Sequence, residues 1–113
     1  MIYVDEIHEY ETPLPYRKWC HMATDGPLEE LHAMAARLGL RREWFQDKPR
    51  SPHYDLVPSK RTLALQQKNE VRAVTAMELI ERCHPELAKA ATKFTKEFVA
   101  WSGIEVVTQE TLF

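Results

Sequence analysis

A histidine and an aspartate that could act together lie two residues apart in the segment Pro52-His53-Tyr54-Asp55-Leu56. In an extended chain, residues two apart point to the same side, so His53 and Asp55 share one side while Tyr54 and Leu56 face the other. An imidazole beside a carboxylate can orient a water molecule, bind a metal ion or hold the polar groups of a ligand.

Two further polar residues are expected to join this pair. Asp5 ends a predicted strand at residues 1–5, and His21 lies near the end of a predicted strand at residues 18–23. Ligands of α/β sheets favour the carboxyl ends of strands, so we expect Asp5 and His21 to converge with His53 and Asp55. A purely structural role is the alternative, such as the capping of a turn by Asp5.

These four side chains include the donor types that zinc and related divalent ions accept. The sequence contains no His-x-x-x-His or Cys-x-x-Cys pair that would support a metal site. We therefore assign no metal ligand and no cofactor from the sequence. Cys20 is not expected to act as a nucleophile with His21, because neighbours along a strand point to opposite faces.

A proline-containing segment at residues 41–58 carries His53 and Asp55 together with aromatic side chains. Loops longer than about 12–15 residues in a compact domain are usually functional or disordered, and the aromatic content argues against disorder. Residues 41–61 hold six basic and three acidic side chains, which favours an anionic ligand, although a solvated surface would look the same. The predicted ligand-binding residues are Asp5, Arg17, His21, Trp44, Gln46, His53, Tyr54, Asp55, Lys60 and Arg61.

The elements that must position these residues alternate between strands and helices. A helix is predicted at 27–38, because Pro27 suits its first turn and Gly39 its end, with Leu28, Leu31, Ala35 and Leu38 buried. Further helices are predicted at 60–68 and 76–83, the latter starting with the capping box Thr75-Ala76-Met77-Glu78, and a strand at 71–74. This order indicates a small layered α/β domain with a short, partly parallel sheet.

A helix predicted at residues 86–102 carries Leu87, Phe94, Phe98 and Trp101 along one stripe. Such a stripe packs on the domain's own core or on a second copy of the chain, and we expect a homo-oligomer through this helix. We accordingly divide the chain into an α/β core at 1–84 and a C-terminal helical extension at 85–113, with a possible edge strand at 104–107.

The composition is that of an ordinary globular protein. Its 113 residues fit a single domain, and a formal net charge of −2 argues against general nucleic-acid binding. No apolar run approaches the length of a membrane span, so we expect neither membrane insertion nor secretion. Cys20 and Cys83 are expected to be reduced thiols in a cytoplasmic protein.

Several short motifs follow one another in a recognisable order: Tyr3-Val4-Asp5, Trp19-Cys20-His21, Trp44-Phe45-Gln46 and His53-Tyr54-Asp55-Leu56. Their order resembles an uncharacterised family of short bacterial and bacteriophage proteins, known only as a domain of unknown function. The resemblance covers about residues 2–82. It implies an intracellular bacterial or viral origin and no established activity.

Our first functional hypothesis is a binding protein without catalysis, whose ligand is a small, nucleotide-like molecule. A phage protein of this kind could sequester a signalling nucleotide, by analogy alone. In this hypothesis Trp44 and Tyr54 stack on a planar group. The polar edges of this group would contact Gln46, His53 and Asp55. The phosphates of the ligand would contact Arg17, Lys60 or Arg61.

Two hypotheses from other classes stay open. One is a hydrolase that uses His53 and Asp55, with or without a metal ion. The other is an interaction module in which the helix at 86–102 pairs subunits and the long loop is structural.

Overall fold

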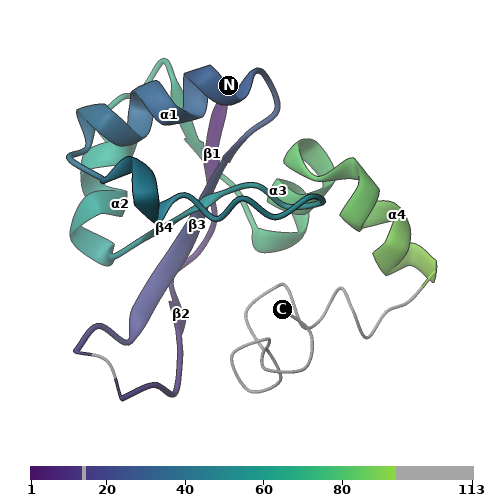
Figure 1. Cartoon of the computed structure of the whole chain (residues 1–113), viewed down its shortest axis with the longest axis horizontal. Helices are drawn as coiled ribbons and strands as arrows, with labels where there is room; N and C mark the ends of the chain where they lie inside the picture. The colour runs from purple at the N-terminus through teal and green to yellow at the C-terminus, as the bar shows by residue number, and fades with distance from the viewer. Residues whose placement is uncertain (14, 94–113) are drawn as a thin grey trace.

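The structure, a computed structural model, describes residues 1–13 and 15–93 (Figure 1). The described residues form a mixed α/β domain with a partly parallel sheet, as predicted. Within this part of the chain, no helix is both long and apolar enough to span a membrane. The elements are β1 (Ile2–Val4), β2 (His8–Glu9), β3 (Lys18–Thr24), α1 (Leu28–Arg37), the 3₁₀ helix η1 (Arg42–Trp44), β4 (Tyr54–Leu56), α2 (Pro58–Leu65), β5 (Val71–Ala73), α3 (Ala76–Cys83) and α4 (Pro85–Lys93).

Strand β3 is the centre of the sheet. It pairs antiparallel with β1, β2 and β4, and β1 also pairs with β5 in parallel. The parallel pair requires a crossover between β1 and β5, which the intervening elements provide.

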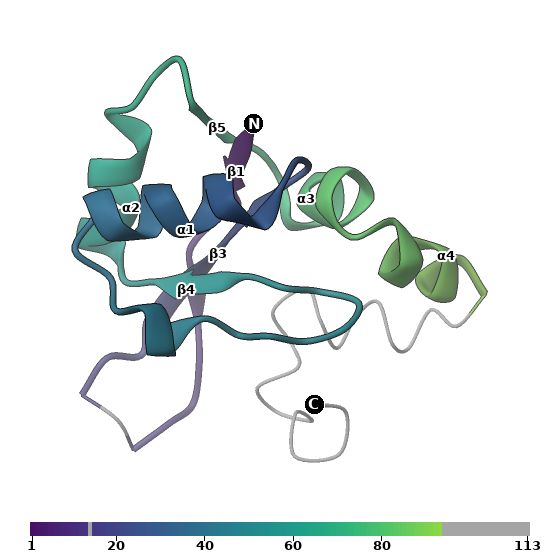
Figure 2. The same ribbon diagram turned by 45° about the horizontal axis from the view of Figure 1, so that its top comes forward.

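Alternate residues of the strands build two different cores. Ile2, Val4 and Met22 face α1 and α2 on one side, where they pack with Leu31 and Ala64 among others. Figure 2 shows α1 and α2 lying close together. The residues between them in the strands point to the opposite face, where Tyr3, Ala23, Leu79, Ile80 and Leu87 form a second apolar cluster under α3 and α4.

Two helices match their sequence signals closely. In α1, Pro27 occupies the N-cap position and the chain leaves the helix through Gly39, whose φ of 81° favours glycine. One detail of the prediction was wrong, because Leu28 is exposed and Met34 is buried in the core instead. In α3, the Thr75 hydroxyl accepts a hydrogen bond from the backbone N–H of Glu78 at 3.0 Å, as the capping box predicts.

Three predictions of local structure need correction. Strand β2 is not among the predicted elements, and the predicted loop at 41–58 contains both η1 and β4. Helix α2 covers Pro58–Leu65 and not 60–68, because Pro58 suits the first helical position.

The predicted C-terminal helix is described only in part. Helix α4 begins at Pro85, and Leu87 is buried against the domain's own α3 face. Phe94, Phe98, Trp101 and the predicted strand at 104–107 lie outside the described residues. Self-association through this helix therefore stays a prediction.

Candidate metal centre

Polar side chains from three strands meet on the sheet face that α3 and α4 partly cover. In the register of β3 with β4, His21 stands opposite Asp55. On the other edge of β3, Val4 pairs with Met22, and the next residue, Asp5, comes beside His21. Asp5, His21 and Asp55 therefore form a row across the sheet, and His53 joins them because it lies two residues before Asp55.

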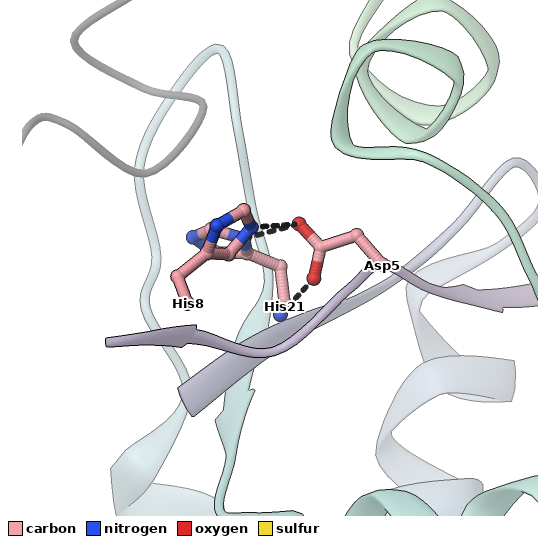
Figure 3. Close-up of side chains that lie close together, drawn as sticks. All are labelled: Asp5, His8 and His21. Carbon is pink, nitrogen blue, oxygen red and sulfur yellow. Dashed lines mark hydrogen bonds and ion pairs between the residues drawn. The ribbon is translucent and has the colours of Figure 1, made fainter. Parts of the chain in front are cut away.

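A β-bulge adds His8 to this group. Three residues separate Val4 from His8, whereas only two separate their partners on β3, Met22 and Trp19. The extra residue reverses the alternation of faces, so His8 points to the same side as Asp5. Figure 3 shows the His8 and His21 rings side by side at the Asp5 carboxylate, and their centroids are 5.8 Å apart.

The Asp5 carboxylate is fully buried and holds His21 at two points. Its Oδ1 accepts the backbone N–H of His21 at 2.6 Å, its Oδ2 lies 2.6 Å from His21 Nδ1, and the same Oδ2 lies 3.4 Å from His8 Nε2. Burial raises the pKa of Asp5, but the hydrogen bonds from His21 and His8 outweigh it and lower the pKa to about 2. The Asp5 carboxylate is therefore ionised and can only accept hydrogen bonds.

That acceptor fixes the tautomer of His21. Nδ1 must carry the proton that Asp5 receives, so Nε2 of the neutral ring has the lone pair. Arg61 supports Asp5 from helix α2 by donating its Nε–H to the Asp5 carbonyl oxygen at 2.8 Å.

His53 is oriented in the same manner by a different acceptor. Its Nδ1 lies 2.6 Å from the carbonyl oxygen of Ser51, which can only accept, so Nδ1 carries the proton. Its Nε2 lies 3.4 Å from Asp55 Oδ1. Burial raises the pKa of Asp55. The hydrogen bond from His53 and the charge of His53 have the opposite and larger effect, so the pKa is lowered overall. The rings of His21 and His53 meet edge to face at 5.3 Å.

Two sets of residues among those described could hold a metal ion, and they share His21. One set is Asp5, His8 and His21, and the other is His21, His53 and Asp55. Tetrahedral zinc with bonds of about 2.0–2.1 Å holds its ligand atoms about 3.4 Å apart. The His53–Asp55 and His8–Asp5 separations both match this spacing, but in the first set His21 Nδ1 and Asp5 Oδ2 are already closed into a hydrogen bond. The second set therefore fits a metal ion better.

A further histidine lies beside this centre. His84 is buried at the C-terminal end of α3. Burial lowers its pKa to about 3, and the charges of His53 and His21 add to the shift. His84 therefore stays neutral and adds no competing charge.

Sequence reasoning missed two of these histidines. His8 joins the site only through the bulge, and the sequence carries no signal for that shift. The position of His84 between a well-marked helix and Pro85 could have indicated a helix end, but not its proximity to His53.

The other predicted site residues lie elsewhere. Tyr54 is buried on the α1 and α2 face, where its hydroxyl and His32 Nδ1 are 2.9 Å apart. Lys60 donates to the carbonyl oxygen of Leu38 at the end of α1, at 2.7 Å. Trp44 is exposed on η1, and Arg17 is exposed where the chain enters β3.

Gln46 has a structural role through its backbone. It exchanges both backbone hydrogen bonds with His53, at 2.8 and 3.2 Å. The structure thus brings Asp5, His21, His53 and Asp55 together and gives Gln46 and Arg61 supporting contacts. Tyr54 and Lys60 do not join the cluster.

The fold and this cluster define a small mixed α/β domain with a candidate metal centre on one face of its sheet. A family profile described as "Protein of unknown function (DUF4031)" matches residues 2–85, and the chain belongs to this family. The matched range runs from β1 to the start of α4 and contains every residue of the candidate centre. Searches of curated proteins and of solved structures found no match.

Proposed function

We propose that the protein is a metal-dependent hydrolase whose divalent ion is bound by His21 Nε2, His53 Nε2 and a carboxylate oxygen of Asp55. The observation that carries the proposal is the pair of buried imidazoles whose Nδ1 atoms are both engaged, one by Asp5 and one by the Ser51 carbonyl. Such outer partners, a carboxylate or a backbone carbonyl, are the usual support of metal-binding histidines. With Nδ1 engaged in each ring, Nε2 is the atom that we propose as the ligand.

The charges at the centre also favour a cation. His53 Nε2 lies 3.4 Å from an oxygen of Asp55, whose pKa is lowered. A carboxylate and a ring nitrogen at this distance are stabilised by a proton or by a cation between them. A divalent ion satisfies both groups and reaches His21 as a third ligand.

Three protein ligands with an open fourth position are typical of catalytic zinc sites, whereas structural sites have four. The Asp55 side chain is 37% exposed. A bound ion of this kind lowers the pKa of a water molecule to near neutrality and polarises the substrate. Asp5 is a positioning residue, because it acts on the ion only through His21.

This proposal uses the residues that come together. A binding protein without catalysis would depend on Tyr54 as a stacking surface and on Lys60 as a phosphate ligand. Tyr54 is buried on the other face and Lys60 binds a backbone carbonyl, so these two residues give that hypothesis little support.

The proposal is tested by titrating chelator-treated protein with zinc chloride in a calorimeter. We expect one equivalent to bind and His53→Gln to weaken binding at least about 100-fold, since one of three ligands is lost. His32→Gln is the matched control, because it changes a histidine on the other face and should bind as the wild type does. The metal centre would be contradicted if the wild-type protein bound no zinc, or if His53→Gln and His32→Gln bound zinc equally well.

Hydrolysis needs a second measurement on the zinc-loaded protein. p-Nitrophenyl acetate and methyl p-nitrophenyl phosphate report ester and phosphodiester cleavage by the release of nitrophenolate. We expect at least one to be cleaved, with activity lost on chelation and restored by zinc. A zinc-loaded wild type no faster than His53→Gln on both substrates would leave a metal-binding protein and contradict the hydrolase.

A further inference from the structure

An exposed tryptophan lies next to the strand that carries two of the proposed ligands. Gln46 and His53 exchange both backbone hydrogen bonds, so they stand directly opposite each other. The next pair along this ribbon, Phe45 and Tyr54, is in ring contact with centroids 5.3 Å apart. Trp44 lies two residues before Gln46, at the end of the 3₁₀ helix η1.

Trp44 differs from its neighbour in the chain in one respect. Phe45 packs against the apolar core and contacts His32 edge to face at 4.6 Å. Trp44 keeps 50% of its surface exposed, with the Arg41 guanidinium 5.9 Å from its ring centroid. A large exposed ring beside an arginine is the combination on which nucleic-acid bases stack.

The segment around Trp44 is also positively charged. Residues 41–50 contain four basic and two acidic side chains. Arg41 precedes the 3₁₀ helix η1 and Arg42 is its first residue, and the Arg42 guanidinium lies 5.7 Å from the centroid of the Phe45 ring. Arg41 pairs with Glu43 and Arg42 contacts His32 on the other face, so the net positive charge of the whole segment, and not one of these arginines, attracts an anionic group such as a phosphate.

Resting on the proposed hydrolase, we infer that its substrate is a phosphate ester that carries a planar base, either a free nucleotide or a nucleotide unit of a single strand. The base stacks on Trp44 and the phosphate lies at the metal ion beside Asp55. Trp44 is two residues from Gln46, the backbone partner of the proposed ligand His53, and this placement suits a ligand whose ring and phosphate are one sugar apart.

The reaction adds one water molecule across a P–O ester bond. The water oxygen forms the new bond to phosphorus, and the ester P–O bond breaks with its electron pair leaving on the alcohol oxygen. The proton of the water passes to solvent, and the leaving oxygen takes a proton from solvent. No oxidation or further reactant is involved.

Two phosphodiesters with the same leaving group isolate the contribution of the base. Thymidine 5′-(p-nitrophenyl phosphate) carries a nucleoside, and methyl p-nitrophenyl phosphate does not. We expect zinc-loaded protein to have the higher kcat/KM on the thymidine ester. Because stacking is worth about 1–3 kcal/mol per base, Trp44→Leu should lower the ratio of the two kcat/KM values by about 5- to 150-fold, mainly through KM.

Tyr16→Leu is the matched control, since Tyr16 is an exposed aromatic residue on the loop before β3 and should leave the ratio unchanged. Competition by thymidine 5′-monophosphate and by oligothymidylate separates the two sources of substrate. Equal inhibition per molecule indicates a free nucleotide, and stronger inhibition by the oligomer indicates a strand. Both results agree with the inference.

An unchanged ratio in Trp44→Leu, or no preference for the thymidine ester in the wild type, would overturn the inference. That result would leave the metal-dependent hydrolase in place. Failure of the wild type to bind zinc would instead remove the proposed function on which this inference depends. The zinc titration therefore tests the proposed function, and the ratio of the two kcat/KM values tests the inference about the substrate.

Discussion

The two faces of the sheet are made from alternating residues of the same strands, yet they carry opposite chemistry. Toward α1 and α2, the strands present Val4, Met22 and Leu56, all fully buried. Toward α3 and α4, they present Tyr3 and Ala23 at one end, followed along the same strands by Asp5 and His21. One face is core throughout, and the other changes from core to a polar cluster.

This difference shows how a small domain can carry a buried polar centre. The polar residues satisfy one another and the backbone, as Asp5 does with His21 and His53 with the Ser51 carbonyl. The continuous apolar face supplies the burial that holds the strands in register. We expect mutations on the first face to change stability and those on the second to change metal binding.

The largest effect on stability is expected for Met22→Ala. Met22 is fully buried against α1 and α2, and its truncation should lower the free energy of unfolding by about 2–5 kcal/mol. Chemical denaturation measures this change. Leu63→Ala is the control, because Leu63 is exposed and should lose less than about 0.5 kcal/mol. Equal losses in the two variants would mean that this face is not the main core.

On the polar face, Asp5→Asn should act mainly on metal affinity. The amide cannot orient His21 as the carboxylate does, and removal of such an outer partner typically costs 10- to 100-fold in metal affinity. Competition with a chromogenic chelator measures the zinc affinity. Glu70→Gln is the control, since Glu70 is exposed and pairs with Arg37 away from the centre. A change of less than about threefold in Asp5→Asn would place Asp5 outside the support of the ion.

A smaller effect is expected at the helix that covers the polar face. Thr75→Ala removes the cap of α3 and should cost about 1 kcal/mol in the free energy of unfolding. The same substitution at Thr62, within α2, removes no cap and should be close to neutral. If both variants unfold alike, the capping bond contributes nothing and α3 is held by packing alone.

The smallest effect is expected for thiol reagents, because burial protects a cysteine in each layer. Burial raises the pKa of Cys20 strongly, and it raises the pKa of Cys83 to about 12. A thiolate is therefore not formed near neutral pH, and Ellman's reagent should release no colour from folded protein at pH 8. Both thiols should react in denaturant. Rapid reaction of one thiol in native protein would show that its layer opens to solvent.

Local signals predicted part of this structure correctly. Helices α1 and α3 were predicted from end signals and apolar spacing, which depend only on residues close together in the sequence. The structure confirmed both helices. The period of two places His53 and Asp55 on one side with Tyr54 on the other, and the structure shows the same arrangement. The family resemblance was also confirmed, over residues 2–85.

The missed features depend on pairing between distant segments. Strand β4 has only three residues in a segment rich in proline, and it forms because β3 offers it an edge. The meeting of Asp5 with His21 was expected from strand ends, but it arises from antiparallel pairing of β1 with β3. His8 enters through a bulge, which is a property of two strands together.

The central claim is that the pairing of β3 with β4 lets one metal ion bind between His21, Asp55 and His53, the residue just before β4. Crystals grown with zinc and measured at the zinc absorption edge test it directly. The account predicts one anomalous peak at about 2.0–2.2 Å from His21 Nε2, His53 Nε2 and an Asp55 oxygen, with Asp5 still bonded to His21 Nδ1. A peak between Asp5 and His8, or none at this face despite zinc in the crystal, would contradict it.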